Sequence, residues 1–211
     1  MEEIIRKFRD GIVTLHNRRF GTVAELMVQA LYGFDAPKDK HHDFYDKTNE
    51  RRIEVKASAV REGHDGAITW DNIIDVCLDS SSAGRLITYE DALKGNKKFS
   101  SPALQLKPGK KDITKEDGVD ISISEFDDLY YCLFFADYIK IFIMTNKEVL
   151  NLDGYSEKHH KTGEMGQFHI TEKNLDKKFG AISYVDYIKE TLTYEELFDL
   201  FEKNKLKHKS T

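Results

Sequence analysis

Apolar residues recur at helical spacing in the first part of the chain, and we expect a helical region over residues 4–34. Thr22 followed three positions later by Glu25 is typical of a helix start, and Gly33 is typical of a helix end. An apolar stripe follows Thr22, formed by Val23, Leu26, Met27, Ala30 and Leu31. The pattern predicts an amphipathic helix that packs one face against a core.

The same signature returns near the end of the sequence. Thr193 followed by Glu196 predicts a helix start, and Leu197 and Leu200 then fall on one face of a helix over 193–203. The lysine-rich residues after it predict a solvated tail.

Between these helical regions the pattern is that of strands. We expect strands over 42–46, 51–58, 102–107, 128–135 and 138–145. The last two are almost continuously apolar, which is typical of strands buried on both faces. The sequence therefore predicts one α/β domain over residues 1–211, in which helices flank a mixed β-sheet.

Composition narrows the class of protein. The chain has 211 residues, 40% of them hydrophobic, which suffices for a sizeable core. The net charge of −5 argues against a nucleic-acid binder that works by bulk positive charge, but it leaves room for a local basic cleft. Two lone cysteines suit a reducing compartment, and the most apolar stretch, 129–144, is too short to span a bilayer. We expect a cytoplasmic protein with no membrane partner.

The predicted hairpin around the polar turn 47–50 carries the most informative pattern. Side chains alternate between the two faces of a strand. One face of the second strand is therefore apolar, with Ile53, Val55 and Ala57. The other face is polar, with Glu54, Lys56 and Ser58.

The turn also predicts the strand register. It pairs Phe44 with Ile53 and places Asp43 directly opposite Glu54. Two facing carboxylates destabilise a sheet, so the arrangement favours a divalent cation between them. Mg²⁺ is a hard ion that takes one or two protein carboxylates together with waters and phosphate oxygens. Lys56 would lie beside that ion, where it can stabilise a phosphorane-like transition state or hold a nucleophilic water.

Other interpretations of these residues remain open. Surface charges on an ordinary half-exposed strand would produce the same letters at Glu54 and Lys56. Glu25 is either a capping residue or a further acid of the site. Asp46 is a rival for the role of Asp43, but the register places Asp46 opposite Arg51 and predicts an ion pair there.

The spacing of the charged residues resembles a known motif. Asp43, ten intervening residues and then Glu54-Val55-Lys56 resembles the motif of the PD-(D/E)xK nucleases. That superfamily includes type II restriction endonucleases, Holliday junction resolvases and repair nucleases. His42 stands where the motif has proline, a change that the family tolerates.

The resemblance implies a restriction-endonuclease-like fold and a magnesium-dependent site. It implies that Asp43, Glu54 and the carbonyl of Val55 bind Mg²⁺, and that Lys56 assists the attacking water. A helix before the hairpin often supplies a further acidic residue in this superfamily, and Glu25 resembles that position.

The order of elements after the hairpin also resembles small type II restriction endonucleases. By analogy we expect cleavage of double-stranded DNA at a specific sequence, a homodimer and a cognate DNA methyltransferase in the same system. The alternatives are a structure-specific nuclease of the resolvase or repair type, and a non-catalytic DNA-binding module on the same fold.

Candidate DNA contacts lie on polar and basic segments. Residues 94–111 contain six lysines and no acid, which is typical either of a phosphate-contacting rim or of a solvated loop. A zinc site at the later histidines is disfavoured, because no Cys or His pair lies at ligand spacing. The residues expected to contact DNA are Ser58, Gln105, Lys107, His159, His160 and Lys161.

Overall fold

The computed structural model describes residues 1–62, 74, 85–95, 104–106, 125–156, 166–171, 175–176 and 183–209. The helices are α1 (Glu2–Thr14), α2 (Asn17–Tyr32), α4 (Tyr89–Lys94), α5 (Asn146–Asn151), the 3₁₀ helix η1 (Tyr184–Tyr187) and α6 (Tyr194–Lys209). The strands are β1 (Phe44–Asp46), β2 (Arg51–Ala59), β3 (Leu104–Leu106), β4 (Asp128–Phe134), β5 (Tyr138–Thr145), β6 (Tyr155–Ser156), β7 (Gly166–Phe168) and β8 (Ile188–Thr193).

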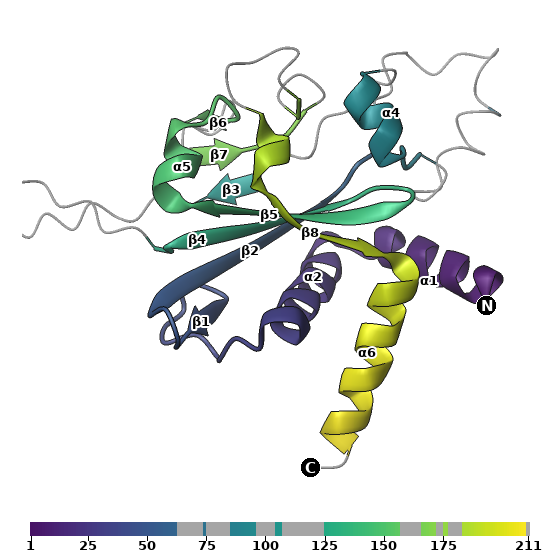
Figure 1. The fold of residues 1–211 in the computed structure, drawn as a ribbon, viewed down its shortest axis with the longest axis horizontal. Coiled ribbons are helices and arrows are strands. Elements are labelled where there is room, and N and C mark those ends of the chain that lie inside the picture. The colour runs from purple at the N-terminus through teal and green to yellow at the C-terminus, as the bar shows by residue number, and fades with distance from the viewer. Residues whose placement is uncertain are drawn as a thin grey trace, which may run out of the picture.

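A mixed five-stranded sheet forms the centre of the molecule, with the strand order β1-β2-β4-β5-β8. β2 and β4 run parallel, and the other neighbours are antiparallel. Helices α1, α2 and α6 cover one face of this sheet, and a three-stranded sheet of β3, β7 and β6 lies with α5 on the other face (Figure 1). The predicted α/β class, with a mixed sheet flanked by helices, is confirmed.

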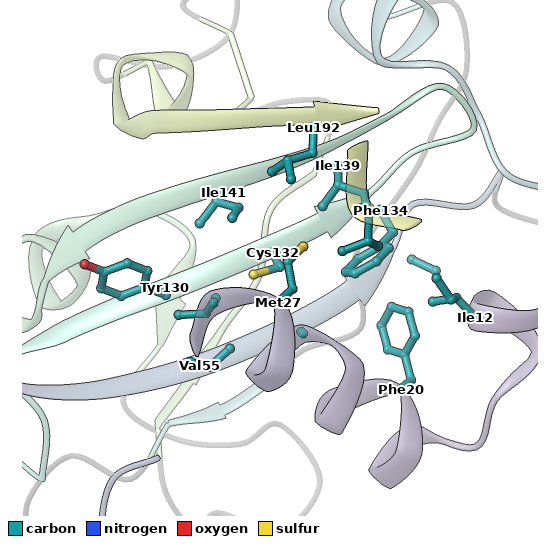
Figure 2. Packing of buried hydrophobic residues seen from close by; sticks show 14 of the residues in the cluster. Ile12, Phe20, Met27, Val55, Tyr130, Cys132, Phe134, Ile139, Ile141 and Leu192 are labelled. Atoms are coloured by element: carbon teal, nitrogen blue, oxygen red, sulfur yellow. The ribbon is translucent and has the colours of Figure 1, made fainter. Parts of the chain in front are cut away.

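Two hydrophobic clusters hold these layers together. On the helical side, Met27 of α2 packs against Val55, Cys132 and Phe134 of the sheet (Figure 2). On the other side, Tyr131 of β4 contacts β7 through an edge-to-face pair with Phe168, whose ring centroid is 5.8 Å away. β4 contributes alternate side chains to both clusters, which confirms that it is buried on both faces.

The helical region expected over 4–34 is divided into two helices. The chain is extended at Leu15 and His16, so α2 begins at Asn17. The prediction of a helix start at Thr22 is wrong, because Thr22 lies inside α2 and its hydroxyl donates to the Arg18 carbonyl at 3.2 Å. The register of the stripe is also partly wrong, since Leu26 is 51% exposed.

The predicted end of α2 and the predicted start of α6 agree with the structure. Gly33 ends α2 in the left-handed conformation, with φ at 69°, which glycine adopts without strain. At the start of α6 the Thr193 N–H donates to Glu196 Oε2 at 2.7 Å, and the Glu196 N–H donates to Thr193 Oγ1 at 3.2 Å. The predicted capping box is therefore present, but the expected tail is helical as far as Lys209.

The ion pair expected between Asp46 and Arg51 does not form. Arg51 instead pairs with Asp128 at the start of β4. Asp46 closes the hairpin turn, where its Oδ1 accepts from the N–H groups of Thr48 at 2.9 Å and Asn49 at 3.2 Å. The correction has a simple cause: the parallel neighbour β4 offers Arg51 a carboxylate that local register cannot reveal.

None of the described helices combines the length and the apolar character needed to cross a bilayer.

Candidate functional site

The hairpin of β1 and β2 places Asp43 at the outer edge of β2. The predicted register is confirmed where Phe44 pairs with Ile53, but the ladder ends there. The Asp43 N–H donates to the Ile53 carbonyl at 2.9 Å, and its Oδ2 accepts from the Val55 N–H at 2.7 Å. The carboxylate of Asp43 thus takes the place of the next strand residue beside β2. The expectation of a regular cross-strand pair with Glu54 is wrong in this detail, because Asp43 lies just beyond the ladder.

Asp43, Glu54 and Lys56 nevertheless open onto one cavity of about 260 Å³. Glu54 and Lys56 are two residues apart on β2, so their side chains share a face. The remaining residues that line this acidic cavity are Lys40, His41, His42, Glu125 and Phe126. The structure therefore brings the two predicted metal-binding acids and the predicted catalytic lysine to one place.

Glu54 is a largely buried carboxylate of the acidic cavity. Its side chain is 15% exposed, and its carboxylate forms an ion pair with Lys56. Burial, helped by the negative charges of Asp43 and Glu125, raises the pKa of Glu54 to about 7 against the opposing effect of the Lys56 ammonium. Because several carboxylates crowd this spot, additional positive charge would stabilise their ionised forms.

Glu25 reaches the same neighbourhood from α2. Burial and the nearby Asp43 raise the pKa of the Glu25 carboxyl, and Lys56 lowers it. The capping interpretation of Glu25 is excluded, because α2 begins eight residues earlier, at Asn17. Lys56 thus forms an ion pair with Glu54 and also interacts electrostatically with Glu25.

Sequence reasoning missed Glu125. This residue lies shortly before β4, whose parallel pairing with β2 sets Leu129 beside Glu54. The Glu125 side chain is 16% exposed, and its Oε1 lies 3.6 Å from Nδ1 of His41. The sequence carried no local signal for it, because a parallel pairing of residues that are 75 positions apart, as Glu54 and Leu129 are, is not encoded in a turn.

The segment before Asp43 is fixed by His42, the residue that stands in place of the motif's proline. The His42 side chain is completely buried, and its Nε2 accepts from the Lys38 N–H at 3.2 Å. Its Nδ1 lies 3.1 Å from Asp39 Oδ1. These contacts fold residues 38–42 back on themselves, and they thereby position Asp43 at the edge of β2.

The donor atoms of the acidic cavity suit a hard divalent cation. In a strand the N–H and C=O of one residue point to the same side, so the Val55 carbonyl faces the edge where Asp43 lies. Within the described ranges, no three or more His, Cys, Asp or Glu side chains are already gathered as a ligand set. Mg²⁺ requires only one or two carboxylates besides waters and phosphate oxygens, and Asp43 and Glu54 meet that need.

Comparisons of the chain with models of protein families, with curated proteins and with solved structures find no match. The interpretation of the acidic cavity therefore rests on its residues and their geometry.

Two of the residues expected to contact DNA, Ser58 and Gln105, lie in the described part of the chain. Ser58 is buried, and its Oγ accepts from the Tyr131 hydroxyl at 3.2 Å, which argues against a direct contact with DNA. Gln105 lies in β3 of the small sheet, where its partner in β7 is Gln167. Lys107, His159, His160 and Lys161 lie outside the described residues.

Proposed function

We propose that this protein is a magnesium-dependent nuclease that hydrolyses phosphodiester bonds of double-stranded DNA in the manner of a type II restriction endonuclease. The observation that carries the proposal is the convergence of Asp43, Glu54 and Lys56 on one cavity at the edge of β2. The mixed sheet flanked by helices is compatible with a restriction-endonuclease-like fold formed by one domain over residues 1–211.

The chemistry follows from the positions of these groups. Asp43, Glu54 and the Val55 carbonyl would hold Mg²⁺. When bound, Mg²⁺ polarises a phosphoryl oxygen and lowers the pKa of a water molecule. Lys56, whose ammonium already contacts Glu54, orients the attacking water and stabilises the negative charge that develops on the phosphate. The water oxygen forms a bond to phosphorus and gives up a proton to solvent. The bond to the 3′ oxygen breaks, and that oxygen takes up a proton from solvent, which leaves a 5′ phosphate.

Cleavage of both strands of a duplex requires two such sites. We therefore propose a homodimer that acts in the cytoplasm, with a cognate DNA methyltransferase protecting the host sequence. The structure-specific nuclease remains the main alternative, and its substrate would be a branched or damaged duplex.

Incubation of the purified protein with Mg²⁺ and a panel of unmodified plasmid, phage and genomic DNA, followed by sequencing of the ends, tests the proposal. We expect discrete fragments with one end sequence. Glu54→Gln and Lys56→Met should each lower the cleavage rate by at least about 10²-fold, because each removes a group of the reacting centre. Glu50→Gln is the matched control, since Glu50 is an exposed acid in the turn of the same hairpin.

The other outcomes separate the alternatives. Cleavage restricted to branched or damaged DNA would favour the resolvase or repair class. DNA binding that persists in Asp43→Asn, with no cutting of any substrate by the wild type, would favour the non-catalytic module and contradict the proposal.

A further inference from the structure

A second cavity, of about 370 Å³, shares Lys56 with the acidic cavity and extends along β2 toward the junction of α1 and α2. Its charged lining residues are Arg18, Glu25, Lys56 and Arg61. Three cations and one carboxylate give this basic cavity a formal charge of +2. The acidic cavity contains three carboxylates, from Asp43, Glu54 and Glu125, and two lysines, Lys40 and Lys56, so its formal charge is −1 with its histidines neutral. The two cavities that share Lys56 therefore differ in sign.

Within the described part of the chain, no strand pairs with the outer edge of β2 along the basic cavity. β1 pairs with β2 only as far as Ile53, and the Asp43 side chain occupies the Val55 N–H. Since every second residue of a strand points its N–H to the same side, the N–H groups of Ala57 and Ala59 face this edge as well. No described strand lies beside them there. The backbone therefore offers N–H donors to a bound oxygen at this edge, alongside the carbonyls of the same residues, while the positive charge of the cavity comes from its side chains.

Arg61 lines the basic cavity, and only part of its guanidinium is hydrogen-bonded within the described residues. Its Nη2 donates to the Val13 carbonyl at 2.8 Å, while its Nε is buried and has no hydrogen-bond partner among the described residues. A buried donor without an acceptor is unfavourable, and an anion bound beside the guanidinium would lessen that cost through its negative charge. A guanidinium presents its donors in a fork that matches phosphate oxygens.

Arg18 provides a second guanidinium, on the first turn of α2. It is exposed, and it has no ion-pair partner in the described part of the chain. The same helix end lacks a side-chain cap and an acidic residue in its first turn, so its positive end is uncompensated. Gly21, one turn on, leaves the wall open, since the nearest atom to a Cβ there would be Glu25 Oε1 at 3.9 Å.

We propose that the basic cavity binds a phosphate group of the DNA backbone next to the phosphodiester that is cleaved at the acidic cavity. This inference rests on the proposed function. Lys56 lines both cavities. When the scissile phosphate of a DNA strand contacts Lys56 in the acidic cavity, the neighbouring phosphate of that strand would lie in the basic cavity, beside Arg18 and Arg61.

The salt dependence of DNA binding tests this inference without any cleavage. Affinity for a duplex is measured in EDTA by fluorescence anisotropy at several salt concentrations. Each phosphate contact contributes about 0.9 to the slope of log K against log salt, so Arg18→Gln and Arg61→Gln should each reduce the slope by about 1. Arg19→Gln is the matched control, because Arg19 is the neighbouring exposed arginine of α2 and does not line the basic cavity.

Two further measurements keep the test independent of folding and of catalysis. Gly21→Glu adds a carboxylate to the basic cavity and should weaken DNA binding at least about tenfold relative to Gly21→Ala, as expected for replacing attraction by repulsion of a phosphate. Inorganic pyrophosphate should raise the melting temperature of the wild type and of Arg19→Gln, but not that of Arg18→Gln.

The results distinguish the two proposals. A wild type that cleaves DNA, with equal slopes in Arg18→Gln and Arg19→Gln, would overturn the phosphate site and leave the nuclease proposal intact. If the wild type never cleaves DNA, but Arg18→Gln and Arg61→Gln reduce the slope of log K against log salt as expected, the phosphate site would be supported and the nuclease proposal contradicted. Absence of both DNA and pyrophosphate binding would overturn both.

Discussion

β2 and β4 are parallel neighbours in one sheet, yet their side chains have different roles. Leu129–Phe134 of β4 are all buried and divide between the two hydrophobic clusters. β2 packs only one face against the helices, and its other face carries Glu54 and Lys56. The comparison indicates that β4 supplies stability, while β2 carries a charged site that lowers it.

The Glu54 carboxylate on the charged face of β2 lowers the stability of the folded protein. Its pKa is raised to about 7 mainly by burial, so the ionised form is less stable in the folded protein than in the unfolded chain. The hydrophobic side chains of β4 and its neighbours compensate for that loss.

The largest expected effect is that of a cavity in β4. Phe134 is fully buried, and its ring centroid lies 4.9 Å from that of Phe20 in α2. Phe134→Ala should lower the free energy of unfolding by about 3–5 kcal/mol, as measured by urea denaturation. Leu150→Ala, at a 43% exposed position, is the control and should cost less than about 1 kcal/mol. Equal losses in the two variants would contradict the role assigned to β4.

On β2 we expect a substitution to raise the free energy of unfolding instead of lowering it. Because the pKa of Glu54 is raised, the folded protein binds more protons than the unfolded chain between pH 4.5 and about 7, and wild-type stability falls as the pH rises through that window. Glu54→Gln removes this dependence. The variant should be more stable than the wild type by about 1–3 kcal/mol above pH 7, with little difference in acid, while its cleavage activity is lost. Denaturant titrations across pH check the sign, and a variant less stable than the wild type at pH 8 would contradict it.

A smaller effect on stability is expected from the ion pair that links β2 to the start of β4. Arg52 of β2 pairs with Asp127, just before β4, through Nη2–Oδ1 at 2.9 Å and Nε–Oδ2 at 3.1 Å. The hydrogen bond from Arg52 lowers the pKa of Asp127, so this stabilisation is present near neutral pH and is lost as the pH falls through the lowered pKa. A double-mutant cycle with Arg52→Ala and Asp127→Ala should give a coupling of about 1 kcal/mol at pH 7. A coupling that persists unchanged in strong acid would rule out the ion pair as its source.

The smallest expected effect lies in α2, opposite β2. Gly21 is a glycine inside a helix, and a Cβ at that position meets only ordinary contact distances. Gly21→Ala should therefore raise the free energy of unfolding by about 0.5–1 kcal/mol. A loss of stability in the denaturant titration would show that the wall of the basic cavity is more tightly packed than the structure indicates.

Local patterns predicted much of this fold because they depend on neighbours in sequence. The pairing of Phe44 with Ile53 follows from a short turn and strand alternation, and the start of α6 follows from Thr193 and Glu196. The edge strand β8 was missed because three of its six residues are exposed polar ones, Lys189–Thr191, which do not alternate with apolar residues. The start of α2 was misplaced because Thr22 and Glu25 match the pattern of a helix start, whereas the chain breaks at Leu15 and His16, which carry no such pattern.

The candidate site was predictable only in the part that the hairpin encodes. Glu54 and Lys56 lie on β2, Asp43 lies just before β1, and the hairpin turn brings the three residues together. Glu125 and Arg61 enter through the parallel pairing of β2 with β4 and the packing of α1, which are non-local. Sequence reasoning could not foresee these contacts, because no periodicity or spacing records them.

Calorimetric titration of the DNA-free protein with Mg²⁺, at pH 6.5 in two buffers of different ionisation enthalpy, tests the central claim most directly. The raised pKa of Glu54 predicts that Mg²⁺ binding releases part of a proton at this pH and almost none at pH 8.5. Glu54→Gln should lose Mg²⁺ binding, whereas Glu50→Gln should retain it. Equal Mg²⁺ binding by the wild type and Glu54→Gln, or no binding by the wild type at millimolar Mg²⁺, would contradict the account.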